Sequence, residues 1–383
     1  MRSTALSKTF SLVILILVTA CDSDDGPGGI QLSSGNIETI AGMGPTKFGF
    51  EGDNGAAISA KIGWVTGVAV DNSGNVYLTD GAANVVRKVS GGNITTIAGT
   101  FIGFNQINNT PYAGDGGSAT AAHLNVPHAA SVDNDGNVIV ADAANHAVRQ
   151  ILAASGVITT VAGKGPGLSG YTGDGGISEQ SKMWNPHGVA YDETGNIYIS
   201  DTQNNAVRMI SKSTGKISTI AGLGPNNPGY SGDNGPSLAA ALNMPEGLAI
   251  DSDGNIYISD SGNNVIRKIS DGIITTIAGT GAQGYTGDEG PALKATFFSP
   301  RGLAVDSKNN LYIADASNNV IRVIHAATGK IYTVAGNGIA GFEGDGGLAI
   351  DAKLSNPLGV ALDNQDNLYI ADTNNSAIRK VPR

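Results

Sequence analysis

The chain has 383 residues, of which 55 are glycine and 40% are hydrophobic, and it carries a formal net charge of −10 at pH 7. This acidic balance argues against nucleic acid as a partner, because binding to phosphate backbones depends on clustered Lys and Arg. The single cysteine, Cys21, excludes an intramolecular disulfide and a metal site built from several thiolates.

The first twenty residues predict a secretory leader. Arg2 and Lys8 supply a positive start, residues 10–18 supply an apolar run, and small residues lead up to Cys21. The tetrapeptide at 18–21, Val-Thr-Ala-Cys, resembles the lipobox of bacterial lipoproteins. That resemblance implies that Cys21 becomes the lipidated first residue of the mature chain; the alternative is an ordinary cleaved signal with an incidental cysteine.

A polar stretch follows the leader and offers almost nothing to bury, which is typical of a solvated tether. We therefore expect a signal peptide at 1–20, a lipidated cysteine and flexible acidic and Gly-rich tether at 21–35, and one folded domain at 36–383. Such a protein would lie in the cell envelope outside the cytoplasm, in the periplasm or at the cell surface. It would meet the membrane through its lipid anchor only.

The rest of the chain repeats one pattern six times: an apolar run ending in Asp, a turn ending in Asn, a second apolar run ending in Asp, and a third run that carries Arg. The opening aspartates are Asp71, Asp133, Asp192, Asp251, Asp306 and Asp363. Repetition at this spacing indicates a repeat architecture. Features common to all six copies are therefore interpreted as scaffold, and positions that differ are where a specific site would be encoded.

Each of the first five copies predicts four strands, which in the fourth copy are residues 247–251, 256–260, 265–269 and 274–277. An Asp-x-x-Gly-Asn string stands between the first two strands in four copies, and Asn309 and Asp366 replace its Gly in the last two. The strings at 133–137 and 251–255 resemble the start of a calcium loop. The downstream bidentate Glu of that loop is missing, however, so we interpret these strings as hairpin turns.

Two further features recur in every copy. The second-strand Asp and the third-strand Arg lie seven residues apart, a spacing across a hairpin that predicts a bidentate ion pair. The connectors between copies carry the phrase aromatic-x-Gly-Asp-x-Gly, with small residues four and seven positions after its Asp. This pattern predicts a short helix with that Asp as its N-cap.

The phrases GVAVD, GNxYIAD and NNxIRK resemble the NHL repeat over residues 36–383. Because known NHL arrays are β-propellers, the resemblance implies an all-β, six-bladed propeller of four-stranded blades. The sixth copy stops after three strands, whereas residues 37–42 form a fourth strand without the other three. We expect strand 37–42 to complete the last blade and close the ring.

In a propeller the first strand of each blade lines the central channel, so the residue directly before it should lie at the channel mouth. The six copies differ there, with Thr66, His128, His187, Glu246, Arg301 and Leu358. We take the first five of these as candidate binding residues.

His128, His187 and Glu246 fall on three consecutive blades and could hold a divalent metal, the one cofactor that the sequence suggests. The Pro-His phrases that end at His128 and His187 resemble the lyase core of peptide-amidating enzymes, a propeller that holds zinc through His at this place. That family uses three such His on non-adjacent blades. The alternative is a set of ordinary polar channel residues in which Glu246 pairs with Arg301.

Two functions remain open. The first is a non-enzymatic, monomeric binding or scaffold module for a protein or envelope polymer, which the lack of a complete catalytic set favours. The second is a metal-dependent lyase or hydrolase at the channel mouth, in which Arg301 stabilises developing negative charge. The long connector after the first blade, which contains Phe101, Phe104, Asn108 and Asn109, could shape a groove there. We expect the other histidines, His123, His146 and His325, at the surface.

Overall fold

The computed structural model of the chain describes residues 35–104 and 112–383. The predicted leader, nearly all of the tether with Cys21, and Asn108 and Asn109 lie outside these residues. The described part consists of β-strands joined by turns and short 3-10 helices. Within it, no helix is long and apolar enough to cross a membrane.

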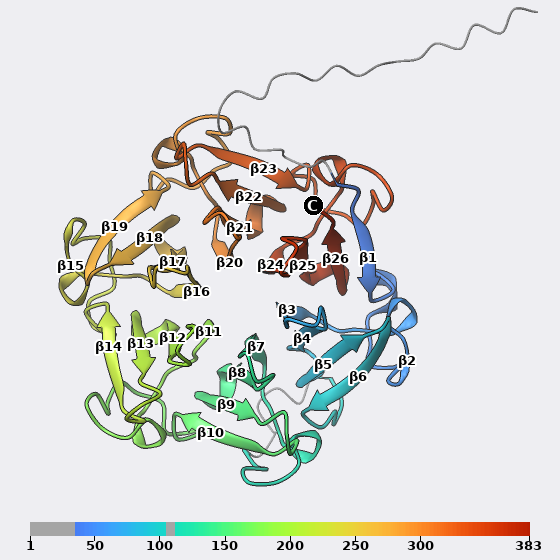
Figure 1. Cartoon of the computed structure of the whole chain (residues 1–383), viewed down its shortest axis with the longest axis horizontal. Helices are drawn as coiled ribbons and strands as arrows, with labels where there is room; N and C mark the ends of the chain where they lie inside the picture. The colour runs from blue at the N-terminus through green and yellow to red at the C-terminus, as the bar shows by residue number, and fades with distance from the viewer. Residues whose placement is uncertain (1–34, 105–111) are drawn as a thin grey trace, which may run out of the picture. The chain divides into compact units, whose positions relative to one another are not determined.

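Six antiparallel sheets surround a central axis like the blades of a propeller (Figure 1). From the axis outward, blade 1 consists of β3 (Val65–Val70), β4 (Val76–Asp80), β5 (Val85–Ser90) and β6 (Asn93–Ala98). Blade 2 consists of β7 (Pro127–Val132), β8 (Val138–Asp142), β9 (Ala147–Ile151) and β10 (Ile158–Ala162). Blade 3 consists of β11 (Val189–Tyr191), β12 (Ile197–Asp201), β13 (Ala206–Ile210) and β14 (Ile217–Ala221). Blades 4 and 5 consist of β16 (Pro245–Ile250), β17 (Ile256–Asp260), β18 (Val265–Ser270) and β19 (Ile273–Ala278); and β20 (Pro300–Val305), β21 (Leu311–Asp315), β22 (Val320–Ile324) and β23 (Ile331–Ala335). The predicted all-β, six-bladed propeller is confirmed.

Blade 6 is built from both ends of the domain. It consists of β24 (Pro357–Leu362), β25 (Leu368–Asp372), β26 (Ala377–Val381) and the N-terminal β1 (Glu38–Ala41). β1 pairs antiparallel with β26, with Glu38 opposite Lys380 and Thr39 opposite Arg379. The predicted closure is therefore correct. Two further strands, β2 (Gly55–Ala56) and β15 (Gly235–Pro236), widen blades 1 and 4 to five strands.

The Asp-x-x-Gly-Asn strings form turns, as predicted. In the first copy, Asp71 Oδ1 accepts the backbone N–H groups of Ser73 and Asn75, and Asp71 Oδ2 accepts the Asn75 side-chain amide. The same three hydrogen bonds recur in the other five copies. The turn therefore occupies both carboxylate oxygens with hydrogen bonds to its own residues.

The connector helix forms only in part. Each connector contains a 3-10 turn after its Asp: η2 (Ala57–Ser59), η3 (Ala119–Ala121), η5 (Ser178–Gln180), η7 (Ser237–Ala239), η9 (Ala292–Lys294) and η11 (Ala349–Asp351). The small residues Ala57 and Ala60 are fully buried, as the pattern predicts. The expected N-cap is wrong, because η2 begins four residues after Asp53 and its N-cap, Ala56, makes no side-chain capping bond.

The connector Asp instead binds the third-strand Arg. Arg87 donates from Nε (3.0 Å) and Nη2 (2.6 Å) to Asp53 Oδ1, and its guanidinium lies 5.1 Å from the centre of the Phe50 ring. Equivalent ion pairs of 2.6–2.8 Å and equivalent aromatic contacts occur in the other five blades. The aromatic-x-Gly-Asp phrase thus ties each connector to its blade.

The predicted pair with the second-strand Asp is present but weaker. In blades 2 to 6 the Arg Nη1 atom lies 3.3–3.5 Å from this carboxylate, a single long contact rather than a bidentate one. Arg208 shows the full set of partners: it contacts Asp201 and Asp174, and it donates to the carbonyls of Lys182 and Thr172. The buried guanidinium is therefore held by several acceptors at once.

Apolar packing joins each blade to its neighbours. The buried apolar residues fall into six clusters, and each cluster is shared by two adjacent blades. Leu78 of blade 1 and Ile378 of blade 6, for example, belong to one cluster. The core is therefore a ring of interfaces between blades, which the closing strand β1 makes continuous.

We predict that Arg208→Met lowers the free energy of unfolding by about 3–5 kcal/mol, because it leaves the buried Asp201 without its counter-ion. Lys353→Met is the matched control, since it breaks an exposed pair with Glu343 and should cost about 1 kcal/mol or less. Urea denaturation measures both. Equal, small losses in the two variants would contradict the structural role of the arginine.

Candidate binding site at the channel mouth

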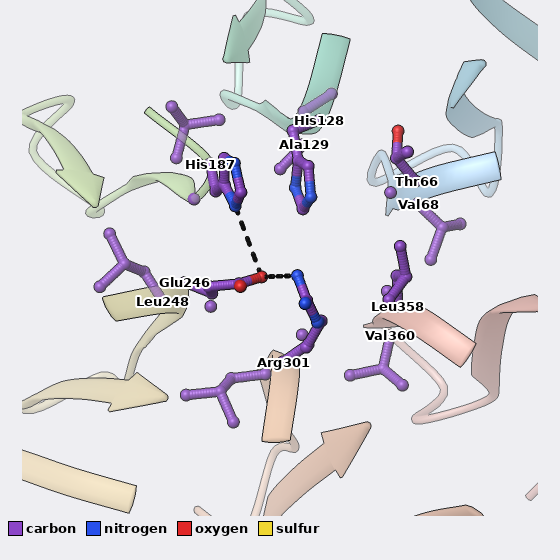
Figure 2. A pocket seen from close by; sticks show the side chains of 18 residues that line it. Thr66, Val68, His128, Ala129, His187, Glu246, Leu248, Arg301, Leu358 and Val360 are labelled. Carbon is purple, nitrogen blue, oxygen red and sulfur yellow. Dashed lines mark hydrogen bonds and ion pairs between the residues drawn. The ribbon is translucent and has the colours of Figure 1, made fainter. Parts of the chain in front are cut away.

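All six predicted mouth residues line one cavity of about 80 Å³ at the end of the channel: Thr66, His128, His187, Glu246, Arg301 and Leu358 (Figure 2). Five of them are the second residue of a first strand rather than the residue before it, and His187 precedes β11. In those five blades the register of the first two strands is irregular at this point. Such irregularities redirect side chains, which fits their position at the mouth.

Below this ring, small residues allow the first strands to approach one another. A Cβ atom on Gly188 would lie 2.0 Å from the Glu246 carbonyl oxygen, and one on Gly247 would lie 2.1 Å from that of Arg301. These oxygens belong to the backbone of the neighbouring first strand and cannot move aside. Glycine is therefore required where the first strands pack closely around the axis. The Gly that follows the mouth residue in five of the six blades, where blade 2 has Ala129, therefore belongs to the scaffold.

The mouth holds one compensated charge pair. Arg301 Nη1 donates to Glu246 Oε2 in a short contact between neighbouring blades, shown as a dashed line in Figure 2. His187 Nδ1 lies 3.5 Å from the same oxygen and makes no hydrogen bond. Asn185 Nδ2 donates to His187 Nε2 at 2.8 Å, so the neutral ring carries its proton on Nδ1, towards the carboxylate.

The charge states follow from burial and from these neighbours. Burial alone would raise the pKa of Glu246, but its contacts with His187 and Arg301 outweigh burial and bring it down to about 2. Burial, and next the proximity of His187, lower the pKa of His128 well below 6.5. At neutral pH the mouth therefore holds an ionised Glu246 and a neutral His128.

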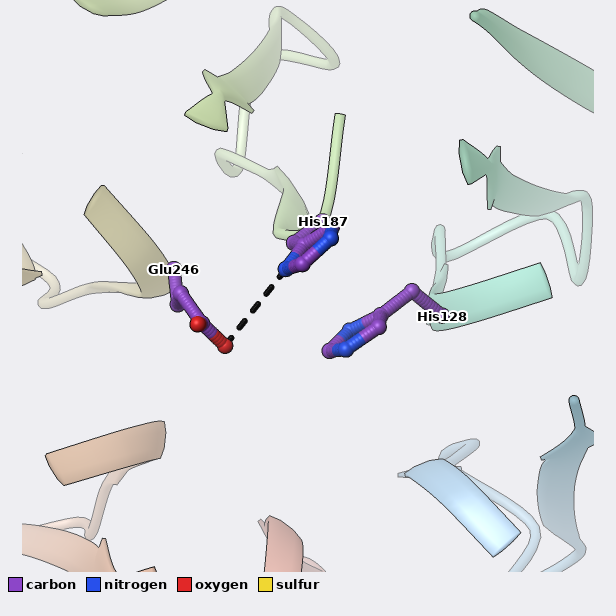
Figure 3. Close-up of side chains that lie close together, drawn as sticks. All are labelled: His128, His187 and Glu246. Carbon is purple, nitrogen blue, oxygen red and sulfur yellow. Dashed lines mark ion pairs between the residues drawn. The ribbon is translucent and has the colours of Figure 1, made fainter. Parts of the chain in front are cut away.

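The three predicted metal ligands come together. The nearest ligand atoms of His128, His187 and Glu246 all lie within 4.8 Å of one another, and no other such group of three occurs within residues 35–104 and 112–383 (Figure 3). Two imidazoles and a carboxylate suit a divalent metal in kind and number. The two rings are stacked, however, with centroids 3.9 Å apart and planes inclined by 7°. In-plane lone pairs of parallel rings do not converge, so a shared ion requires one ring to turn.

Exposed apolar side chains occur in the segments that lead to the mouth, and sequence reasoning missed them. Trp64, Trp184, Met244 and Phe298 are two or three residues before a mouth residue, and 38–50% of each is exposed. A comparison of the six copies could have shown them, because the equivalent positions in the other blades are small or polar except for Val126. These four residues are called the apolar rim below.

The long connector of blade 1 extends this rim with aromatic rings. Phe48 lies 6.0 Å from Trp64 and 4.9 Å from Phe104 between ring centroids, and Phe104 lies 4.9 Å from Phe101. Phe101 in turn contacts Phe50 at 4.6 Å. The two phenylalanines that the sequence singled out therefore belong to a cluster that begins at the mouth.

The structure corrects in part the prediction that the remaining histidines lie at the surface. His325 is buried, with 9% exposed, and its Nδ1 is hydrogen-bonded to the Thr328 hydroxyl at 3.0 Å. His146 Nδ1 accepts the backbone N–H of Asn185, and burial lowers the His146 pKa. His123 is half-buried. These rings fill positions in turns and connectors that sequence alone does not show to be covered.

Comparisons with known proteins agree with this architecture. The NHL repeat family matches residues 124–151, 183–208, 297–324 and 354–381, and the teneurin NHL domain family matches residues 222–286. Teneurin-1 of Mus musculus is 30% identical over 261 residues, which are 62% of this chain and 9% of that protein. NHL repeat-containing protein 2 of Bos taurus is 26% identical over 284 residues, or 67% of this chain and 38% of that protein.

Among solved structures, an auxiliary nutrient binding protein from Bacteroides thetaiotaomicron has a TM-score of 0.63 with 16% identity, over 90% of this chain and 75% of that chain. At this identity the likeness concerns the fold alone. The fold and the channel mouth define a six-bladed β-propeller with a candidate site on its axis. The chain is a propeller that contains NHL repeats.

Proposed function

We propose that this propeller is a binding module whose channel-mouth face holds a protein or an envelope polymer. The observation that carries the proposal is the contrast between the small cavity and its apolar rim. About 80 Å³ is well below the roughly 300–1,000 Å³ of pockets that enclose small molecules. A sizeable ligand would therefore lie over the mouth, where Trp64, Trp184, Met244 and Phe298 are exposed.

A comparison of the six sequence copies supports the channel-mouth face as the binding surface. The buried arginines, their aspartates and the Asp-x-x-x-Asn turns recur in every blade, so six equal ligand sites would be needed if they bound a partner. The mouth residues and the apolar rim differ from blade to blade. A single asymmetric ligand is best matched by a single asymmetric surface.

We further propose that the module is tethered outside the cytoplasm through Cys21. The leader pattern at 1–20 and the lipobox-like tetrapeptide at 18–21 support this location. The polar stretch at 22–35 would let the propeller reach a partner away from the membrane surface.

The binding face can be tested by single-cysteine cross-linking in a chain that also carries Cys21→Ser. Phe298→Cys places a thiol on the apolar rim, and Leu238→Cys places one on a side chain that is 59% exposed on the connector turn η7. In a membrane extract of the source organism, we expect a cross-linked adduct from Phe298→Cys and none from Leu238→Cys. Equal adducts from both positions, or an adduct from Leu238→Cys alone, would contradict the proposed face.

The tether has its own test. Cys21→Ser in the full chain should move the protein from the membrane fraction to the soluble fraction, because it removes the proposed site of lipidation. Ser23→Ala serves as the control and should stay with the membrane. If Cys21→Ser remains in the membrane fraction, the proposed anchor is wrong.

A metal-dependent lyase or hydrolase is the second candidate, and the proximity of His128, His187 and Glu246 favours it. A divalent ion there would polarise a substrate or a water molecule. Protein purified without chelators should then contain about one equivalent of metal by elemental analysis. The variant with both His128→Ala and His187→Ala should lose that metal, whereas His123→Ala should keep it. Absence of metal, or its retention in the double variant, would rule this candidate out.

A further inference from the structure

The two members of the mouth ion pair are unequally accessible. The Arg301 side chain is 27% exposed, whereas that of Glu246 is 3% exposed. A ligand that approaches the mouth therefore meets the guanidinium and not the carboxylate. Within the described residues, the Arg301 side chain is hydrogen-bonded only to Glu246, and this bond uses one of its five N–H donors. The remaining donors favour a carboxylate as their partner.

The surroundings of Arg301 have the composition of a protein interface. The cores of such interfaces are enriched in aromatic residues, Met and Arg, and Trp and Arg dominate their binding energy. The apolar rim contributes Trp64, Trp184, Met244 and Phe298, which are exposed in the segments that lead to four of the mouth residues, and Phe298 is three residues before Arg301. Met and Phe offer no hydrogen bonds to the hydroxyl groups of a polysaccharide, so this composition favours a protein.

The cavity limits what can enter. About 80 Å³ accommodates a few water molecules, since each occupies roughly 30 Å³ in the liquid. It suits the end of an acidic side chain better than a sugar or aromatic ring. The rest of the ligand must therefore lie on the apolar rim.

We infer that the mouth face recognises a segment of a partner protein that inserts one carboxylate against Arg301 and packs flanking apolar side chains on the apolar rim. The inference rests on the proposed binding function and narrows its ligand to a class of peptide segment. The carboxylate is that of an Asp or Glu side chain or of a chain terminus.

Selection from a peptide library tests this inference on the full chain. We expect random twelve-residue peptides displayed on phage to be enriched for an acidic residue with apolar neighbours. A synthetic consensus peptide should bind about 10–100-fold more weakly when its acid is replaced by the amide, as expected for a hydrogen bond to a charged group. The double variant Arg301→Gln with Glu246→Gln should cause a similar loss without leaving a buried charge unpaired.

Two further variants separate this inference from the broader function. Trp64→Ala should weaken the consensus peptide, and Ile58→Ala, at a residue that is 58% exposed on η2, should not. Binding that depends on Trp64 but not on Arg301 would contradict the proposed carboxylate contact, but it would leave the mouth face as the binding surface. Binding that no mouth variant changes would contradict both. Failure to enrich any acidic motif, or binding of polygalacturonate in place of peptides, would also overturn the inference.

Discussion

The fold depends on one buried guanidinium in each blade. Each third-strand Arg is at most 1% exposed, yet it meets a carboxylate and an aromatic ring of one connector phrase, and in blades 2 to 6 it also meets a second-strand carboxylate. A charge buried to this degree is tolerated only when its partners are in place. The interaction therefore fixes the path of the connector, and the connector leads the chain to the mouth of the same blade.

Repetition and variation divide the molecule into two parts. What recurs in all six copies builds the turns and the arginine sites, and a glycine shared by five copies allows the close approach of the first strands. What varies is concentrated at the mouth, where His128, His187, Glu246 and Arg301 line one small cavity, and exposed tryptophans occur in the segments that lead to it. The scaffold thus brings together side chains that are 55 to 62 residues apart in the sequence, and no single repeat could supply this surface.

Much of this arrangement follows from sequence because propeller repeats are nearly independent of one another. The closing strand, the Asp-x-x-Gly-Asn turns and the ring of mouth residues were all predictable. The sequence did not predict which Asp binds each Arg most closely, because Asp53 is 34 residues from Arg87 and the spacing favoured the Asp of the hairpin. The stacking of His128 on His187 and the exposure of Trp64 also depend on how neighbouring blades and connectors cover the mouth, which no local pattern records.

Hydrogen–deuterium exchange of the full chain, with and without its cross-linked partner, tests the central claim that specificity lies in the non-repeating side chains of one face. The account predicts protection in segments 64–68, 184–189, 244–248 and 298–303, and unchanged exchange in the turns at 71–75 and 133–137 at the other end of the strands. Protection of those turns, with none at the mouth, would contradict it.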